Sequence, residues 1–309
     1  MRFIDEHKDR RVEGGLRWGV EPICEVLTEH NLAIAPATYY AAKTRPLSPR
    51  RLRDEALKPV IAHLHERNYG VYGVRKLHAA LRRDGVPIGR DQTARLMRQL
   101  GLTGVRRGKV KRTTIADPAA SRPADLVNRE FHAQRPDRLW VCDLTYLRTW
   151  AGFAYLALVI DVFSRRILGW AFADHMRTEL PLEALELAIW TRQQPRLDRL
   201  VHHTDAGSQY LAIRYAATLS ATGAIASVGT VGDSYDNALA ESTIGQIKAE
   251  LIAGRGPWRT LDQLEFALFE YIDWWNHRRL HSEIGMIPPA EAEANYYRQA
   301  KTMETAGSQ

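Results

Sequence analysis

The order of apolar segments in the second half of the chain most strongly limits the folds that this sequence can adopt. From residue 138 onward, short runs rich in Val, Leu, Ile, Trp and Tyr alternate with segments of helical periodicity. This order favours a mixed sheet with helices on both faces, which is an α/β architecture. Strands are predicted at 139–147, 153–162, 166–173, 198–204 and 224–229, and helices from Pro181, over 208–222 and around Glu241.

Three acidic residues fall where this arrangement brings strand ends and a helix together. Asp143 lies in the first predicted strand, Asp205 directly follows the fourth, and Glu241 lies in the helix after a polar loop. Carboxylate oxygens are suitable ligands for Mg²⁺ and leave coordination positions for water and substrate. Two such ions about 3.5–4 Å apart stabilise both the attacking and the leaving oxygen at a phosphodiester. The predicted catalytic and metal-binding residues are therefore these three, with two Mg²⁺ ions, for which Mn²⁺ could substitute.

Other polar residues compete for a place in this site. Asp161 lies at a predicted strand end, where a structural hydrogen-bonding role is favoured over a ligand role. No Cys and no further His lies near His202 and His203, so we interpret both as strand residues that precede Asp205. Asp233 and Asp236 are expected to cap the following helix.

The helix that carries Glu241 has a predicted core side and a predicted polar stripe. Its core side is expected to consist of Ala240, Ile244, Ile247 and Leu251. Steps of three or four residues stay on one face of a helix, so Glu241, Gly245 and Lys248 form a stripe roughly 10 Å long. A single helical lysine is usually a solvated surface group. From the residues alone, that remains the preferred interpretation of Lys248.

Charge divides unevenly along the chain. Residues 1–124 contain 25 Lys and Arg against 13 Asp and Glu, whereas residues 125–309 contain 18 against 23. Most of the excess lies in residues 50–112, with 17 basic and 5 acidic side chains. This asymmetry indicates a front half that binds a polyanion, and a solvated basic face without a partner is the alternative.

The basic region contains two predicted helices joined by a turn at 84–88, which matches helix-turn-helix geometry. The second helix, 93–100, is expected to bury Ala94, Met97 and Leu100. A structural helical hairpin followed by an ordinary solvated linker is the alternative. The predicted DNA-binding side chains of this region are Arg90, Arg95 and Arg98, followed by Arg106, Arg107, Lys109, Lys111 and Arg112 as phosphate contacts.

Composition sets further limits on the class of protein. The chain is 45% hydrophobic and 26% charged, which is typical of globular proteins. It has no apolar run of membrane-spanning length, and its two cysteines, Cys24 and Cys142, form no zinc spacing. We expect a cytoplasmic protein without a membrane partner. The expected segments are 1–49 (helical), 50–112 (DNA-binding), 113–135 (linker), 136–295 (catalytic core) and 296–309 (tail).

Several motifs around the three acids resemble one known family. They are the runs 139–146, 159–167, 204–210 and 232–248, and Trp274-Trp275-Asn276-His277-Arg278-Arg279-Leu280-His281. The chain is similar to DDE transposases of the retroviral-integrase type, in particular to OrfB proteins of bacterial insertion elements with two overlapping reading frames. It departs from them at Ala206, where the family usually has Arg; this leaves the ligands intact and puts a nearby phosphate or structural contact in doubt.

The resemblance implies a ribonuclease-H-like integrase catalytic core, a mixed sheet flanked by helices, preceded by an all-α helix-turn-helix-like region. It implies metal-dependent cleavage and strand transfer of DNA at the element ends and the target, with Lys248 as a DNA contact. It also implies a frameshift fusion with an upstream-frame protein and a homo-oligomer on DNA. Two alternatives stay open: a ribonuclease-H-like nuclease without strand transfer, and a catalytically dead DNA-binding regulator.

Overall fold

The computed structural model describes residues 1–11, 14–106, 126–127, 132–193, 197–205, 213–228 and 237–307. The chain divides into two compact units, Met1–Pro59 and Val60–Gln309. In the first unit, α1 (Arg2–His7), α2 (Val20–Glu29) and α3 (Pro36–Thr44) enclose a small apolar core. Its buried side chains are Ile4, Val20, Ile23, Cys24 and Tyr39.

The helix α4 (Pro49–Arg67) continues from the first unit into the second. On this helix, Ile61 and Leu64 are buried, Leu57 is half-buried, and Leu52 and Val60 are exposed. Burial of its apolar side chains is concentrated in the last two turns, which belong to the second unit. The helix ends where the backbone of Tyr69 and Gly70 takes positive φ angles.

The predicted helix-turn-helix-like pair is present as α5 (Val74–Arg83) and α6 (Arg90–Gln99), which pack against each other. The buried face of α6 differs from the prediction, because Thr93, Leu96 and Met97 are buried, whereas Ala94 and Leu100 are half-buried. Thr93 can be buried because its hydroxyl donates to the carbonyl of Gly89 at 3.0 Å. A polar residue with a local hydrogen bond therefore occupies a core position that the apolar pattern assigned to alanine.

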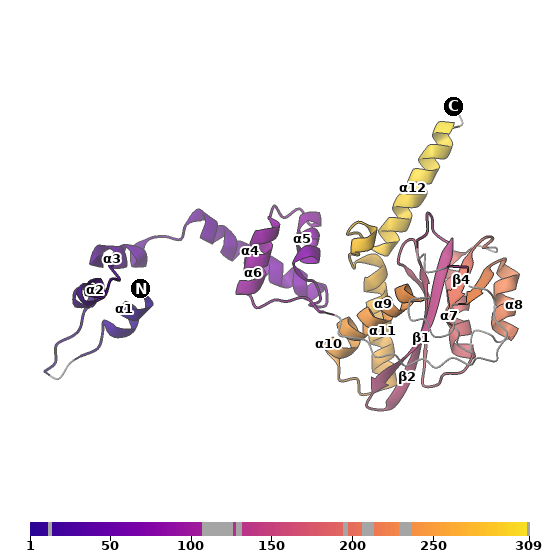
Figure 1. The fold of residues 1–309 in the computed structure, drawn as a ribbon, viewed down its shortest axis with the longest axis horizontal. Helices are drawn as coiled ribbons and strands as arrows, with labels where there is room; N and C mark the ends of the chain where they lie inside the picture. Colours follow the sequence, from indigo (N-terminus) through magenta and orange to yellow (C-terminus); the bar gives the residue numbers. More distant parts are fainter. Residues whose placement is uncertain are drawn as a thin grey trace. The chain divides into compact units, whose positions relative to one another are not determined.

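The five predicted strands form one mixed sheet in the order β3-β2-β1-β4-β5 (Figure 1). The strands β1 (Leu139–Thr149), β2 (Gly152–Asp161) and β3 (Ile167–Ala173) are antiparallel. The strands β4 (Val201–Thr204) and β5 (Ile225–Val228) run parallel to β1. This is the α/β architecture that the order of the apolar segments predicts.

Helices cover both faces of the sheet. One face packs on α7 (Glu179–Arg192) and α8 (Ile213–Thr222), and their shared core includes Trp140, Val159, Leu185 and Leu219. The close approach of α7 to β3 requires Gly169, because a Cβ there would lie 1.9 Å from the carbonyl oxygen of Ala184. The opposite face contacts α9 (Ala238–Ile247) at β1 and α11 (Leu261–His277) at β3.

The chain after α9 is almost entirely helical. A π-helix, η2 (Lys248–Ile252), continues directly from α9 and leads into α10 (Ala253–Arg255). After α11 and the short 3₁₀ helix η3 (Ser282–Ile284), α12 spans Pro289–Gly307. The segment 296–309, which the sequence assigns to a tail, is therefore helical as far as Gly307. Among the described helices, none is both long and apolar enough to cross a membrane.

Candidate active site

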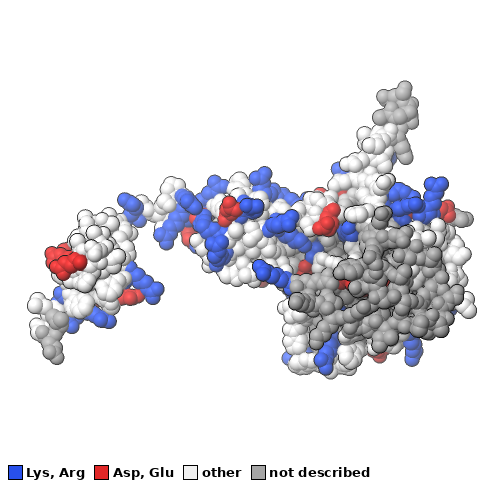
Figure 2. Space-filling model, viewed as in Figure 1, with Lys and Arg blue, Asp and Glu red and all other residues white. Residues whose placement is uncertain are grey.

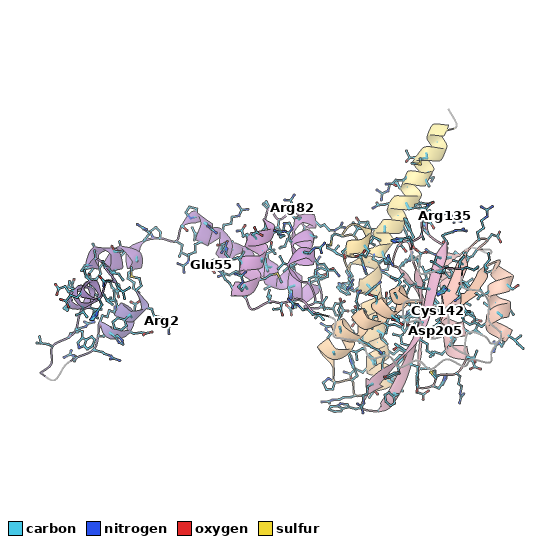
Figure 3. All side chains as sticks on the ribbon, viewed as in Figure 1. Arg2, Glu55, Arg82, Arg135, Cys142 and Asp205 are labelled. Atoms are coloured by element: carbon cyan, nitrogen blue, oxygen red, sulfur yellow. The ribbon has the colours of Figure 1, made fainter. Side chains whose placement is uncertain are left out.

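Strand pairing places Asp143 and Asp205 at the same edge of the sheet. Cys142 pairs with Thr204 in the parallel β1–β4 ladder, and Asp143 and Asp205 are the residues that follow them. Figure 3 shows Cys142 and Asp205 close to each other beside β1. Because parallel strands bring their carboxyl ends to one edge, side chains distant in sequence meet there. Ala206, where this chain departs from the family pattern, lies outside the described residues.

The pKa of the Asp143 carboxyl group is affected by both of the other predicted ligands. Burial raises its pKa well above the usual value, and the negative charges of Asp205 and Glu241 raise it further. The backbone N–H of Leu144 donates to Asp143 Oδ1 at 2.8 Å and, with the charge of Lys248, acts in the opposite direction. The fold thus brings the three acids close enough for their charges to interact.

The position of Glu241 follows from the way α9 is attached to β1. The side chain of Asn237, which precedes the helix, donates from Nδ2 to the carbonyl of Cys142 at 2.8 Å. The predicted core side of the helix is confirmed, since Ala240, Ile244, Ile247 and Leu251 are all buried. This packing leaves Glu241 exposed in the first turn of α9, on the side of the other two acids.

Lys248 lies between the acids and the surface. Its side chain is half-buried, and burial lowers its pKa while attraction to Asp143 raises it. Its ammonium nitrogen lies 4.9 Å from the centre of the Tyr146 ring. Lys248, which the sequence places on the same helical stripe as Glu241, therefore interacts with both the acidic cluster and an exposed aromatic side chain.

The chemistry of this cluster suits a divalent cation. Three mutually repelling carboxylates offer oxygen ligands, and a bound cation would relieve the repulsion that raises the pKa of Asp143. Within the described part of the chain, however, no three His, Cys, Asp or Glu side chains are close enough to enclose one ion. Asp143, Asp205 and Glu241 are thus neighbours whose donor atoms fit the metal, without forming a closed set of ligands.

The rival acid Asp161 has the structural role that the sequence favours. It is fully buried, and it accepts hydrogen bonds from the backbone N–H groups of Asp137 at 2.9 Å and Ser164 at 2.8 Å. Arg192 lies 3.7 Å from it and also pairs with Glu293 of α12 at 2.7 Å. These contacts join the end of β2 to α7 and α12 and leave Asp161 outside the acidic cluster.

The histidines before Asp205 are also structural. His202 Nε2 lies 2.6 Å from the hydroxyl of Tyr215, and His203 Nδ1 lies 2.9 Å from the hydroxyl of Ser227. Both are buried, and burial lowers the pKa of His202 to about 3. The two contacts connect β4 to α8 on one side and to β5 on the other. The predicted helix caps Asp233 and Asp236 lie outside the described residues.

The predicted DNA-binding arginines differ in exposure. Arg90, Arg98 and Arg106 are exposed, whereas Arg95 is half-buried and has an interaction partner. Figure 2 shows Lys and Arg side chains outnumbering Asp and Glu over α4, α5 and α6. Four of the predicted phosphate contacts lie outside the described residues; they are Arg107, Lys109, Lys111 and Arg112.

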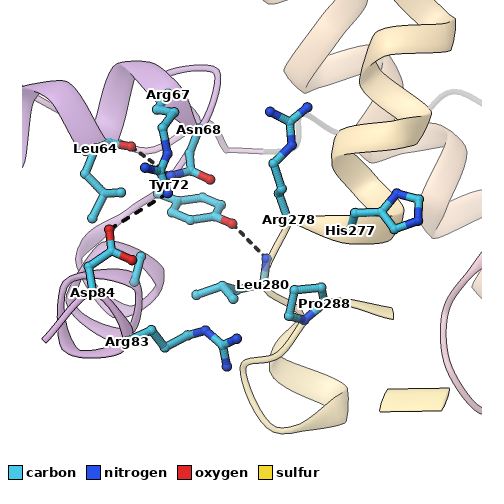
Figure 4. A pocket seen from close by; sticks show the side chains of 11 residues that line it. Leu64, Arg67, Asn68, Tyr72, Arg83, Asp84, His277, Arg278, Leu280 and Pro288 are labelled. Carbon is cyan, nitrogen blue, oxygen red and sulfur yellow. Dashed lines mark hydrogen bonds and ion pairs between the residues drawn. The ribbon is translucent and has the colours of Figure 1, made fainter. Parts of the chain in front are cut away.

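The sequence did not predict that the Trp274–His281 motif attaches the helix-turn-helix-like pair to the core. The indole of Trp274 donates to Asn68 Oδ1 at 3.2 Å. The backbone N–H of Leu280 donates to the hydroxyl of Tyr72 at 2.7 Å, as Figure 4 shows. A cavity of about 190 Å³ lies beside this contact, bordered by Arg67, Arg83 and Arg278. The adjacent residues Trp274 and Trp275 indicate burial in the sequence, but the sequence does not indicate which segment packs against them.

Comparisons with known proteins agree with this architecture. Two models described as "Integrase core domain" match residues 133–234 and 223–289, and one described as "HTH-like domain" matches residues 52–110. The chain is 53% identical to the "Putative transposase for insertion sequence element IS986/IS6110" of Mycobacterium tuberculosis, over 87% of this chain and 98% of that protein. It is 46% identical to the "Transposase for insertion sequence element IS629" of Shigella sonnei, over 91% and 93%.

Solved structures were compared as well. The chain is similar to the HTLV-2 integrase catalytic core domain in complex with magnesium, with 18% identity and a TM-score of 0.42. That match covers 52% of this chain and 99% of the other.

Proposed function

This chain belongs to the insertion-element transposases with an integrase core domain, and we propose that Asp143, Asp205 and Glu241 form its catalytic site. Membership of the family favours DNA transposition over the nuclease and regulator alternatives. The observation that carries the assignment is the electrostatic interaction of Asp143 with the other two acids where β1 and β4 end.

The three carboxylates would hold divalent cations, two Mg²⁺ ions with Mn²⁺ as a substitute. Bound there, the metal supplies Lewis-acid stabilisation of the attacking and leaving oxygens at the phosphodiester. Asp143 accepts a hydrogen bond from the Leu144 N–H, which limits the orientations of its carboxyl group before substrate arrives. Glu241 is exposed on α9, and a small movement of its side chain toward Asp143 and Asp205 would close the set of ligands.

The reaction has two steps at this one site. Water first attacks a phosphodiester at an element end, and the bond to the departing strand breaks to free a 3′-OH. That hydroxyl then loses its proton and attacks a target phosphodiester; the new bond joins the element end to the target 5′-phosphate, the target P–O3′ bond breaks, and the target strand leaves with a free 3′-OH, without a covalent link to the protein. Lys248 would bind a DNA phosphate beside the acids, since its ammonium lies at the boundary between the acidic cluster and the surface.

The DNA-binding and catalytic functions are proposed to lie in different segments of the chain. The proposed segments are 50–112 for DNA binding, with Arg90, Arg95, Arg98 and Arg106 among the contacts, and 136–295 for catalysis. The basic excess over residues 50–112 supports contact with DNA phosphates at element ends and target. The active form is a homo-oligomer on DNA, and an upstream-frame protein, joined by frameshifting, contributes to recognition of the ends.

A strand-transfer assay in Mg²⁺ tests the catalytic assignment. A labelled duplex that ends in the element's terminal repeat is incubated with wild type, Glu241→Gln, and the matched control Glu265→Gln, whose side chain is exposed on α11. Loss of a ligand that stabilises the transition state should reduce joining by at least about a thousandfold, while the control keeps wild-type activity.

Other outcomes separate the alternatives. Cleavage by wild type without joined products would support the nuclease. Binding of DNA with neither cleavage nor joining, by the chain and by its fusion form, would support the regulator. Full activity of Glu241→Gln would remove Glu241 from the site.

A further inference from the structure

The end of the β1–β2 hairpin exposes three aromatic side chains. Tyr146 is 43% exposed, Trp150 is 70% exposed and Phe153 is 52% exposed. The rings of Tyr146 and Phe153 meet edge to face, with their centres 5.6 Å apart. We call these three residues the aromatic patch. A contiguous exposed apolar surface of this kind marks an interaction site more often than a single exposed ring does.

Each ring of the aromatic patch has a cation above it. Lys248 lies 4.9 Å from the Tyr146 ring, the guanidinium of Arg148 lies 6.0 Å from the Phe153 ring, and that of Arg259 lies 5.8 Å from the Trp150 ring. Considering only described residues, neither of these two arginines forms an ion pair with a carboxylate. The surface therefore presents flat rings and available positive charge together.

The patch is held in place by the loop that carries Arg259. The backbone N–H of Trp150 donates to the carbonyl of Trp258 at 2.9 Å. Trp258 is itself buried, and its indole donates to the carbonyl of Ile252 at 3.1 Å. The hairpin end is thus anchored to the segment after α10, and little conformational entropy would be lost when a ligand binds.

Tyr146 is the residue of the aromatic patch nearest to the acidic cluster along β1. Tyr146 follows Asp143 by three residues on β1, a distance of about 10 Å along a strand. Among the described residues, β1 has no strand partner along this edge beyond Cys142, where its pairing with β4 ends, and the hairpin extends beyond the shorter strands (Figure 1). Lys248 lies at this edge, within reach of both Asp143 and the Tyr146 ring.

We propose that the aromatic patch binds unpaired nucleotides of the DNA strand next to the reacting phosphodiester, with bases stacked on Trp150 and Phe153 and phosphates paired with Arg148 and Arg259. Flat rings interleaved with cations are the surface that proteins use for single-stranded nucleic acid. Paired bases in duplex DNA are stacked on one another, so unpaired nucleotides offer these rings faces that a duplex does not. The proposal rests on the proposed function, because it assigns the strand to the same site.

The test measures binding of two labelled duplexes of the same sequence in EDTA, one blunt and one with a short single-stranded extension that contains 2-aminopurine. The full chain is compared with Trp150→Ala, Phe153→Ala and the control Trp190→Ala, which removes a 71%-exposed tryptophan from α7. Each patch substitution should weaken binding of the extended duplex about tenfold and abolish the change in 2-aminopurine fluorescence. Binding of the blunt duplex should stay unchanged.

Trp150→Tyr should retain most of the affinity, since a flat ring remains. Equal affinity of wild type and patch variants for the extended duplex would overturn the proposal. The proposal would also be overturned if a patch substitution changed the molar mass of the protein in solution without changing its affinity for the extended duplex. The patch would then be a contact between protein chains. Joining assays in Mg²⁺ with the same duplexes distinguish a failure of this stacking proposal from a failure of the proposed function. Wild type that binds the extension but neither cleaves nor joins would contradict the proposed function alone.

Discussion

At the scale of single residues, the repulsion between Asp143, Asp205 and Glu241 has a cost for folding. Burial and two like charges raise the pKa of Asp143, so the unfolded chain accommodates its ionised carboxylate better than the folded chain does. Binding sites commonly retain such unfavourable arrangements because the ligand relieves them. In this protein the relief would come from a divalent cation.

Asp143→Asn should therefore stabilise the metal-free protein and weaken its response to Mg²⁺. We expect the free energy of unfolding in EDTA to rise by about 0.5–2 kcal/mol, because the substitution removes one of the repelling charges. Wild type should gain stability as Mg²⁺ is added, through preferential binding to the folded state, and the variant should gain less. Urea denaturation with and without Mg²⁺ measures both effects.

Asp174→Asn is the control for this comparison, because Asp174 is exposed and follows β3, outside the acidic cluster. Its response to Mg²⁺ should equal that of wild type. A variant at Asp143 that is less stable than wild type in EDTA would contradict the expected repulsion.

At the scale of elements, the π-helix η2 connects the Glu241 helix to the Trp274–His281 motif. Glu250 of η2 is buried and accepts hydrogen bonds from Tyr271 at 2.6 Å and from Arg279 Nε at 3.0 Å. Arg279 also donates to Gln246 of α9 at 2.6 Å. One buried guanidinium thus ties α9 and η2, which carry Glu241 and Lys248, to the chain after α11. π-helical turns are uncommon and often occur at functional sites.

Arg279→Met should destabilise the protein by about 3–5 kcal/mol, because it leaves the buried carboxylate of Glu250 without its cation. The neighbouring substitution Arg278→Met is the matched control, since Arg278 is exposed and pairs with an exposed Asp273. Its effect should stay within about 0.5 kcal/mol. Urea unfolding of the two variants distinguishes the buried arginine from the exposed one.

The double variant Arg279→Met with Glu250→Gln should recover part of the lost stability, because both charges are then absent. If the single and double variants are equally unstable, the loss comes from packing against Trp275, whose ring lies 4.4 Å from the guanidinium, and not from the uncompensated charge.

At the scale of the whole molecule, the basic excess and the acidic cluster lie in different segments of the chain. Residues 50–112 carry 17 basic against 5 acidic side chains, whereas the acidic cluster lies in the sheet. Within the second unit, the helix-turn-helix-like pair also contacts the core through an ion pair of Arg83 with Glu291 of α12. The basic side chains that would contact DNA are therefore separate from the acids proposed to hold the metal.

Replacing Arg90 and Arg98 together by alanine should weaken binding of duplex DNA and lower its dependence on salt. If both contact phosphates, the slope of log affinity against log salt should fall by about 2 in magnitude, close to one for each lost contact. Arg214→Ala is the control, because Arg214 is exposed on α8 of the core. Fluorescence anisotropy over a series of salt concentrations measures the slope, and an unchanged slope would exclude both arginines as phosphate contacts.

Much of the fold follows from local patterns in the sequence. The five strands and the buried side of the Glu241 helix are present where alternation and helical spacing place them. Such patterns are readable because consecutive residues alone decide which side chains share a face. The three acids could be identified for the same reason, since each occupies a distinct position relative to a predicted strand or helix.

Only the tertiary structure decides which polar side chains are buried and which other side chains they pair with. Arg278 and Arg279 are adjacent and chemically identical, yet one is exposed and the other lies against Glu250, because α11 ends at His277 and the chain turns there. Likewise, Arg192 is buried because Asp161 and Glu293, from distant parts of the chain, converge on it. Periodicity describes each segment separately, whereas the pairing of buried charges depends on how separate segments pack.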